Sequence, residues 1–156
     1  MDTFFKILIM IVIASAGGLI FRSWLERKRA DRKQVAFLND MVKKAEGKFQ
    51  NNYNGTAPDT LKDAFGGGYS MFFNSFPYRI ENAGEALKMY EGVMKDGVKQ
   101  SVFNQKIILL SESSALVTYN WIRGGASGKT THVWRLEHGQ GWKLMHDHTS
   151  HNAGGK

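Results

Sequence analysis

The sequence predicts an α+β fold in which helices pack on an antiparallel sheet, preceded by one transmembrane helix. Three features predict it: an apolar N-terminal run, a helical period of apolar residues in the first half, and an alternating period in the second half. With 156 residues, the chain has room for one domain and a terminal segment. We expect a transmembrane helix at 3–24, a basic juxtamembrane segment at 25–34, a folded domain at 35–150 and a flexible tail at 151–156.

The only charged residues of the first segment are Lys6 and Arg22, which lie near its two ends. A helix that crosses a bilayer needs about 20 apolar residues, and cations at its ends reach the interface with their long side chains. Phe4, Phe5 and Trp24 are expected to act as aromatic anchors at the two interfaces.

A cleaved signal peptide is the alternative interpretation of this segment. Ala14-Ser15-Ala16 fits the small-residue cleavage pattern. The N-terminal MDTFFK is not distinctly basic, however, and the residues after the cleavage point are strongly basic, which resists export. We therefore favour an uncleaved single-pass anchor, with the C-terminal domain in the cytoplasm by the positive-inside rule.

Positive charge is concentrated directly after the apolar run. The net charge is +7, and residues 22–33 hold six basic residues against two acidic ones. Such clusters bind anionic lipid headgroups, and no nucleic-acid-reading motif accompanies this one, so we expect a bilayer and not a nucleic acid as partner. Cysteine is absent, which excludes disulfides and thiol chemistry. The residues expected at the headgroups are Arg27, Lys28, Arg29, Arg32 and Lys33.

Three helices are expected in the first half of the domain. The first has apolar residues at three- and four-residue spacing and ends near Asn51–Gly55. A short helix follows at Pro58–Phe65 and is broken by three glycines, and a third spans Glu85–Met94. Between them, Tyr69–Ile80 suggests a small hairpin or irregular edge. The apolar stripe of the first helix consists of Val35, Leu38, Met41, Val42, Ala45 and Phe49.

Four consecutive antiparallel strands are expected after Gly97, where the apolar period changes to two. They span 102–110, 115–123, 130–137 and 142–149, with joints at 111–114, 124–128 and 138–141.

The C-terminal strands carry a family resemblance through Ala115–Tyr119, Thr131–Arg135 and Gly141–Ser150. The chain resembles the nuclear transport factor 2-like superfamily, in particular the SnoaL-like proteins and the association domain of calcium/calmodulin-dependent kinase II. The resemblance implies cone-shaped packing of helices on a curved sheet, a pocket between them, and a convex face that is commonly a dimer interface. The fold hosts enzymes and pure oligomerisation modules alike.

The resemblance also suggests candidate site residues. Enzymes of the superfamily place acidic, His, Tyr or Arg side chains in the cavity, and His132 with Asp147 on adjacent strands could form an acid–base pair here. The alternative is that the histidines only satisfy structural hydrogen bonds. We expect no metal and no cofactor. The expected cavity-lining residues are Tyr78, Tyr119, His132, Trp134, Asp147 and Thr149.

Two classes of function follow. We favour a membrane-anchored, non-enzymatic module that forms a homodimer or hetero-oligomer and serves as an accessory or scaffold subunit of a membrane protein complex. The alternative is a cavity enzyme of the isomerase, cyclase or hydrolase type that acts on a hydrophobic small molecule. A secretion-system assembly factor is a weaker third reading, because such domains are periplasmic and the charge bias opposes that location.

Overall fold

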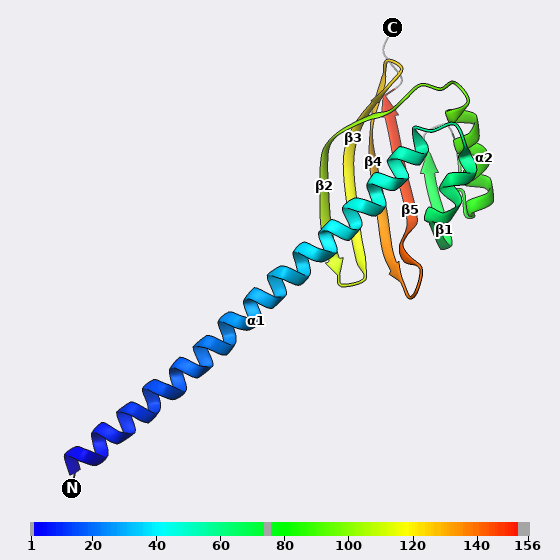
Figure 1. Ribbon diagram of the computed structural model, residues 1–156. Coiled ribbons are helices and arrows are strands. Elements are labelled where there is room, and N and C mark those ends of the chain that lie inside the picture. The colour runs from blue at the N-terminus through cyan, green and yellow to red at the C-terminus, as the bar shows by residue number, and fades with distance from the viewer. Residues whose placement is uncertain (1, 74–75, 153–156) are drawn as a thin grey trace. The chain divides into compact units, whose positions relative to one another are not determined.

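One long helix begins the chain: α1 spans Asp2–Tyr53 (Figure 1). This computed structural model describes residues 2–73 and 76–152, with side chains from residue 22 onward. The chain divides into two compact units, Met1–Phe37 and Leu38–Lys156.

The first unit exposes the predicted basic segment. Arg22 pairs with Glu26 one helical turn away, with 3.1 Å between Nε and Oε1. The Lys28 ammonium lies 4.3 Å from the ring centroid of Trp24, a cation–π contact. The cations Arg27, Lys28, Arg29, Arg32 and Lys33 are all exposed.

No helix is long and apolar enough to span a membrane among the residues whose side chains the structure describes. The predicted anchor at 3–24 lies almost wholly before those residues, so the expected roles of Phe4, Phe5 and Lys6 fall outside this description.

The predicted apolar stripe of α1 begins three residues later than expected. Leu38, Val42 and Phe49 are buried, whereas Val35 is 50% exposed. Val35 belongs to the first unit, and the core of the second unit begins at Leu38. The prediction for Val35 was therefore wrong, while the helix end at Tyr53 agrees with the predicted stop.

Two further helices follow at the expected places. The short 3₁₀-helix η1, Pro58–Ala64, starts at a proline and buries Leu61. Helix α2, Ala83–Met94, is capped by Asn82, whose side chain accepts a hydrogen bond of 2.8 Å from the backbone N–H of Glu85. The buried side of α2 includes Met89 and Tyr90.

Five strands form one sheet within the described residues, in the order β1-β5-β4-β3-β2. Strands β2 (Ser101–Ser111), β3 (Ser114–Arg123), β4 (Ala126–Glu137) and β5 (Gly141–Asn152) form the predicted antiparallel meander. The joint between β3 and β4 is shorter than predicted. Gly124 and Gly125 turn the chain alone, both with positive φ, as a two-residue hairpin turn requires.

The sheet is mixed rather than purely antiparallel, because β1, Phe65–Phe73, joins its edge parallel to β5. The three glycines at 66–68 lie inside this strand, where we expected only a helix break. Glycine carries no apolar side chain, so the alternation that marks a strand is missing there. The expected edge beyond Tyr69 is present, with a single antiparallel bridge between Met71 and Ile80.

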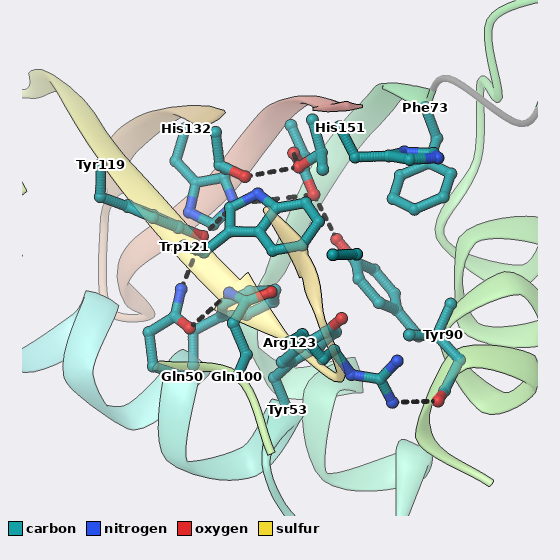
Figure 2. Close-up of a pocket in the computed structure, with 16 residues that line it drawn as sticks. Gln50, Tyr53, Phe73, Tyr90, Gln100, Tyr119, Trp121, Arg123, His132 and His151 are labelled. Atoms are coloured by element: carbon teal, nitrogen blue, oxygen red, sulfur yellow. Dashed lines mark hydrogen bonds and ion pairs between the residues drawn. The ribbon is translucent and has the colours of Figure 1, made fainter. Parts of the chain in front are cut away.

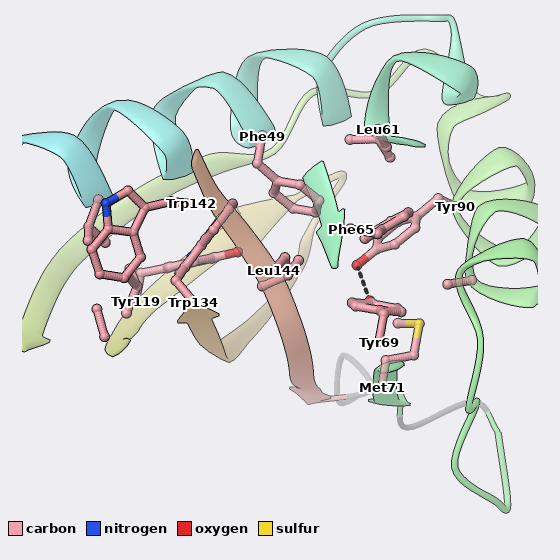
Figure 3. Packing of buried hydrophobic residues seen from close by; sticks show 14 of the residues in the cluster. Phe49, Leu61, Phe65, Tyr69, Met71, Tyr90, Tyr119, Trp134, Trp142 and Leu144 are labelled. Atoms are coloured by element: carbon pink, nitrogen blue, oxygen red, sulfur yellow. Dashed lines mark hydrogen bonds between the residues drawn. The ribbon is translucent and has the colours of Figure 1, made fainter. Parts of the chain in front are cut away.

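One face of the sheet carries the core of the second unit. Alternate residues of β3 are buried, and they pack with residues of α1, η1, α2 and β1 in one cluster (Figure 3). Aromatic rings dominate its centre: Phe49 of α1 lies 6.4 Å from Trp134 of β4 and 6.0 Å from Tyr90 of α2, between ring centroids. The helices therefore cover a single face of the sheet and meet it through large rings.

We expect Trp134→Ala to lower the free energy of unfolding by about 3–5 kcal/mol, as for truncation of a fully buried aromatic. Trp134 is 0% exposed, and its indole N–H donates to Glu46. Urea unfolding followed by circular dichroism measures the change. The control is Tyr78→Ala, which removes a ring that is 69% exposed and should change stability by less than about 0.5 kcal/mol. Equal effects of the two variants would contradict the described core.

Candidate functional site

A pocket of about 240 Å³ lies between the helices and the buried face of the sheet (Figure 2). Helices α1 and α2 and strands β3, β4 and β5 all contribute to its wall, which combines aromatic rings with hydrogen-bonding side chains. The lining includes Phe49, Gln50, Tyr53, Tyr90, Gln100, Tyr119, Trp121, Arg123, Thr130, His132, Asp147 and Thr149.

A β-bulge decides which side of β5 faces the pocket. Val133 pairs with His146 and Trp134 pairs with Leu144, so Met145 is the extra residue on β5. Before the bulge the even-numbered Leu144 is buried, and after it the odd-numbered Asp147 is buried. An extra residue reverses the alternation of side chains along a strand. The bulge therefore places a carboxylate in the wall of the pocket.

The structure brings together the two residues predicted as an acid–base pair. His132 and Asp147 are direct partners across β4 and β5. His132 Nε2 lies 3.6 Å from Asp147 Oδ2, and both side chains are almost completely buried.

A second carboxylate, Glu46 of α1, lies on the other side of the imidazole and was missed by the sequence reasoning. Its Oε2 is 2.8 Å from His132 Nδ1, and Trp134 Nε1 donates to the same oxygen at 2.8 Å. Gln50 donates to the other oxygen, also at 2.8 Å. Glu46 is 0% exposed. Its position one turn after Val42 and one turn before Phe49–Gln50 was the available signal, because this places it on the apolar stripe.

Hydroxyl groups complete the surroundings of Asp147. Tyr90 donates to Asp147 Oδ2 at 2.5 Å, and Thr149 donates to Oδ1 at 2.8 Å. Behind them, the hydroxyl oxygens of Tyr69 and Tyr90 are 3.4 Å apart, and those of Thr130 and Thr149 are 2.7 Å apart. The carboxylate is thus held in place from α2, β4 and β5 together.

The two carboxylates determine the charge state of His132. Burial alone would lower the pKa of this imidazole, but Glu46 and Asp147 outweigh burial and raise its pKa to about 10. Burial would likewise raise the pKa of Glu46 and of Asp147, but the imidazolium and the hydrogen bonds lower the pKa of both. At neutral pH the site therefore holds an imidazolium between two carboxylates.

The remaining predicted cavity residues divide into two groups. Tyr119 and Thr149 line the pocket with His132 and Asp147. Tyr78 does not line it, because this ring lies beyond the edge strand and is 69% exposed. Trp134 does not line it either, because its ring is enclosed in the core below Phe49.

No metal centre is formed by the residues that the structure describes: no three His, Asp or Glu side chains converge in a way that could hold an ion. His146 and His148 lie on the other side of β5 from Asp147, where both rings contact Phe72 of β1. Gln50, Gln100 and Arg123 were not among the predicted site residues. They come from α1, the segment before β2, and β3, and only the fold brings them to one pocket.

The architecture defines a class of protein, an α+β domain with helices on one face of a mixed sheet and a polar pocket between them. No family profile matches the chain, and no curated protein matches it. Solved structures do match. A nuclear transport factor 2-like superfamily protein from Salmonella enterica is 14% identical, with 76% of this chain and 94% of that chain covered and a TM-score of 0.65.

Two further structures are similar to the chain. A protein of unknown function of the DUF3225 family from Pectobacterium atrosepticum is 16% identical, covers 76% of this chain and 93% of its own, and has a TM-score of 0.66. A protein assigned to the scytalone dehydratases, from Novosphingobium aromaticivorans, is 13% identical, with 77% and 87% covered and a TM-score of 0.65. Identities this low establish the fold alone: the described domain has the nuclear transport factor 2-like fold.

The charge state of His132 predicts how stability depends on pH. The folded-state pKa of about 10 lies above the ordinary value of 6.5, so the network's contribution is fully present below about pH 6.5 and is lost as pH rises through about 10. Glu46 and Asp147 have lowered pKa values in the folded state, so their ionised forms stabilise the fold at neutral pH. This contribution to stability is lost as the pH falls through those lowered values.

Urea unfolding between about pH 6 and about pH 10 measures this dependence. We expect His132→Gln to flatten the alkaline decline, whereas His138→Gln on the exposed turn before β5 should leave it unchanged. An equal decline in all three proteins would contradict the imidazolium assignment.

Proposed function

We propose that this chain is a membrane-anchored, non-enzymatic module of the nuclear transport factor 2-like fold, acting as an accessory or scaffold subunit of a membrane protein complex. The observation that carries the non-enzymatic part is the mutual pairing of Glu46, His132 and Asp147 in the pocket wall.

Paired in this way, these groups are poorly suited to acid–base catalysis. A general base works best with a pKa near the operating pH. Here the imidazole is already protonated, and both carboxylates have lowered pKa values, which makes them weak bases. Glu46 also accepts hydrogen bonds from His132 and Trp134, which join α1 to the sheet, and one from Gln50 of its own helix. The network is therefore better suited to stabilising the contact of α1 with the sheet than to transferring protons.

The anchor rests on the sequence of residues 3–24 and on the cations that follow. A run of about 20 apolar residues suffices to cross a bilayer, and each exposed cation beside it contributes about 1 kcal/mol of attraction to anionic lipid. Small residues at 14–18 would let a helix of a partner subunit approach closely. The same charge bias supports a cytoplasmic location for the folded domain.

Exposed apolar side chains on the outer face of the sheet support self-association. Ile108 pairs with Leu116 and Phe103 pairs with Asn120, and these β3 partners alternate with the buried residues. Ile122 lies on the same outer face and is 50% exposed. Apolar side chains of this kind favour burial against a second protein surface.

A cavity enzyme that acts on a hydrophobic small molecule is the second candidate. The observation that favours it is the pocket itself, because its wall combines aromatic rings with His132 and Asp147. The same fold occurs in the similar structure assigned to the scytalone dehydratases.

Membrane topology tests the anchor. With a reporter fused at Lys156, we expect activity from a reporter that works in the cytoplasm and none from one that works only after export. The matched control replaces Arg27, Lys28 and Arg29 together by glutamate. Because cytoplasmic flanks are normally basic, this change should weaken or invert the preference for a cytoplasmic C-terminus. Export of the unaltered fusion would contradict the proposed orientation.

Asp147→Asn separates the module from the enzyme. We expect the full chain to sediment in neutral detergent as a dimer or larger, and the variant to keep both this state and the membrane localisation. We further expect neither the unaltered chain nor the variant to convert a substrate, because the proposed function is not enzymatic. A hydrophobic compound that the chain converts, and that Asp147→Asn no longer converts, would establish the enzyme instead; a monomer at high concentration would remove the scaffold.

A further inference from the structure

The register of the sheet gives the pocket two different ends. His132 pairs with Asp147 on β5 and with Val117 on β3, and Arg123 lies six residues further along β3. The side chain of Arg123 is 15% exposed, whereas those of His132 and Asp147 are 1% and 4% exposed. The pocket therefore has a deep end at His132 and Asp147 and an outer end at Arg123.

The polar groups of the deep end bind one another. His132 lies between Glu46 and Asp147, and Asp147 accepts hydrogen bonds from Tyr90 and Thr149. A hydrogen bond to a ligand adds most where a protein group would otherwise lack a partner. A ligand therefore gains less from polar contacts at the deep end than from groups that are still free.

Arg123 and Gln100 lie side by side at the outer end. Strands β2 and β3 pair as far as Ser101 and Ile122, so the next position places Gln100 opposite Arg123. The Arg123 Nε donates to the backbone oxygen of Val98, two residues before Gln100, at 3.0 Å. Both side chains line the pocket (Figure 2).

Each of these two side chains keeps an atom that has no partner among the described residues. Arg123 uses Nε and Nη2 to donate to two backbone carbonyls and to Asp96, which leaves both N–H groups of Nη1. Gln100 Nε2 donates to Gln50 at 3.4 Å, and its carbonyl oxygen Oε1 is left over. The outer end thus offers a free donor next to a free acceptor.

From this adjacent donor and acceptor we propose that the pocket binds a small aromatic carboxamide. The carbonyl oxygen of a carboxamide accepts from Arg123 Nη1, and its N–H group donates to Gln100 Oε1. A carboxylate has no N–H group and competes with Asp96 for the same guanidinium. An ammonium is repelled by that guanidinium. A neutral amide therefore matches the outer end better than either ion.

Aromatic side chains fit the ring of this ligand. Tyr53, Tyr90 and Trp121 line the pocket from α1, α2 and β3, and such rings pack favourably against another ring, stacked or edge to face. Burial raises the pKa of Tyr53 to about 12, although Arg123 opposes this, so the hydroxyl keeps its proton at neutral pH. The volume of about 240 Å³ is smaller than that of typical sites for drug-sized ligands, which favours a single ring with a short substituent.

Calorimetry with four probes of nearly equal size tests the inference: benzamide, acetophenone, benzoate and benzylamine. The full chain is titrated at neutral pH in a non-ionic detergent, and the heats from protein-free micelles are subtracted. Acetophenone keeps the carbonyl oxygen but lacks the N–H group, so we expect it to bind about fivefold more weakly than benzamide, as for the loss of one hydrogen bond. Benzoate and benzylamine should each bind at least about fivefold more weakly than benzamide, because each lacks one of the two matching groups.

Three variants locate the preference. Gln100→Met removes the free acceptor and should weaken benzamide about fivefold while leaving acetophenone unchanged. The matched control, Gln140→Met on the exposed turn before β5, should change neither affinity. Val93→Trp fills the pocket from α2 and should weaken both probes. Circular dichroism establishes that each variant is folded.

The proposal fails if any other probe binds as tightly as benzamide, or if none of the four binds. It also fails if Gln100→Met leaves the preference for benzamide over acetophenone intact, or if Val93→Trp leaves benzamide binding unchanged. This inference needs only the fold and its pocket. Its failure would leave the membrane-anchored module standing, and a failed anchor would leave the ligand preference of the pocket intact.

Discussion

The structure of the folded domain depends on the pairing of Glu46 with His132. It is the point at which α1 forms a charged hydrogen bond to the centre of the sheet, beside the hydrogen bond from Gln50 to Tyr119 and the apolar contacts of the same helix. A carboxylate enclosed in apolar surroundings is tolerated only when it is paired and hydrogen-bonded, and removing one partner of such a pair typically costs about 3–5 kcal/mol. The pairing therefore fixes which turn of α1 faces which residue of β4, a constraint that apolar packing alone enforces less strictly.

The bulge at Met145 is the second constraint, because it joins the core to the pocket on one strand. On the near side of the bulge β5 supplies Leu144 to the apolar cluster, and beyond it the strand supplies Asp147 to the polar network. A strand with unbroken alternation could not do both on the same face. Between Leu144 and Asp147, the buried face of the sheet therefore changes from apolar core to the polar lining of the pocket.

These two constraints connect the proposed functions. A network that is saturated within the protein stabilises the domain and leaves no free acid or base, which supports a binding or scaffold role over catalysis.

Most of the secondary structure was predictable from the sequence, because periodicity is a local property. The four meander strands, α2 and the end of α1 follow from alternating and helical patterns that the burial of one face imposes. The resemblance of the C-terminal strands also pointed to the nuclear transport factor 2-like fold, and to His132 and Asp147 as neighbours. Tertiary structure alone decided the rest. Glycines at 66–68 hid a parallel edge strand, and the bulge left no mark in the pattern. The spacing of Glu46 placed it on the apolar stripe of α1 but could not show which side chains would pair with it. Each of these depends on which surfaces meet across the fold, and the partners that make a carboxylate stable in a core lie 86 and 88 residues away in the sequence.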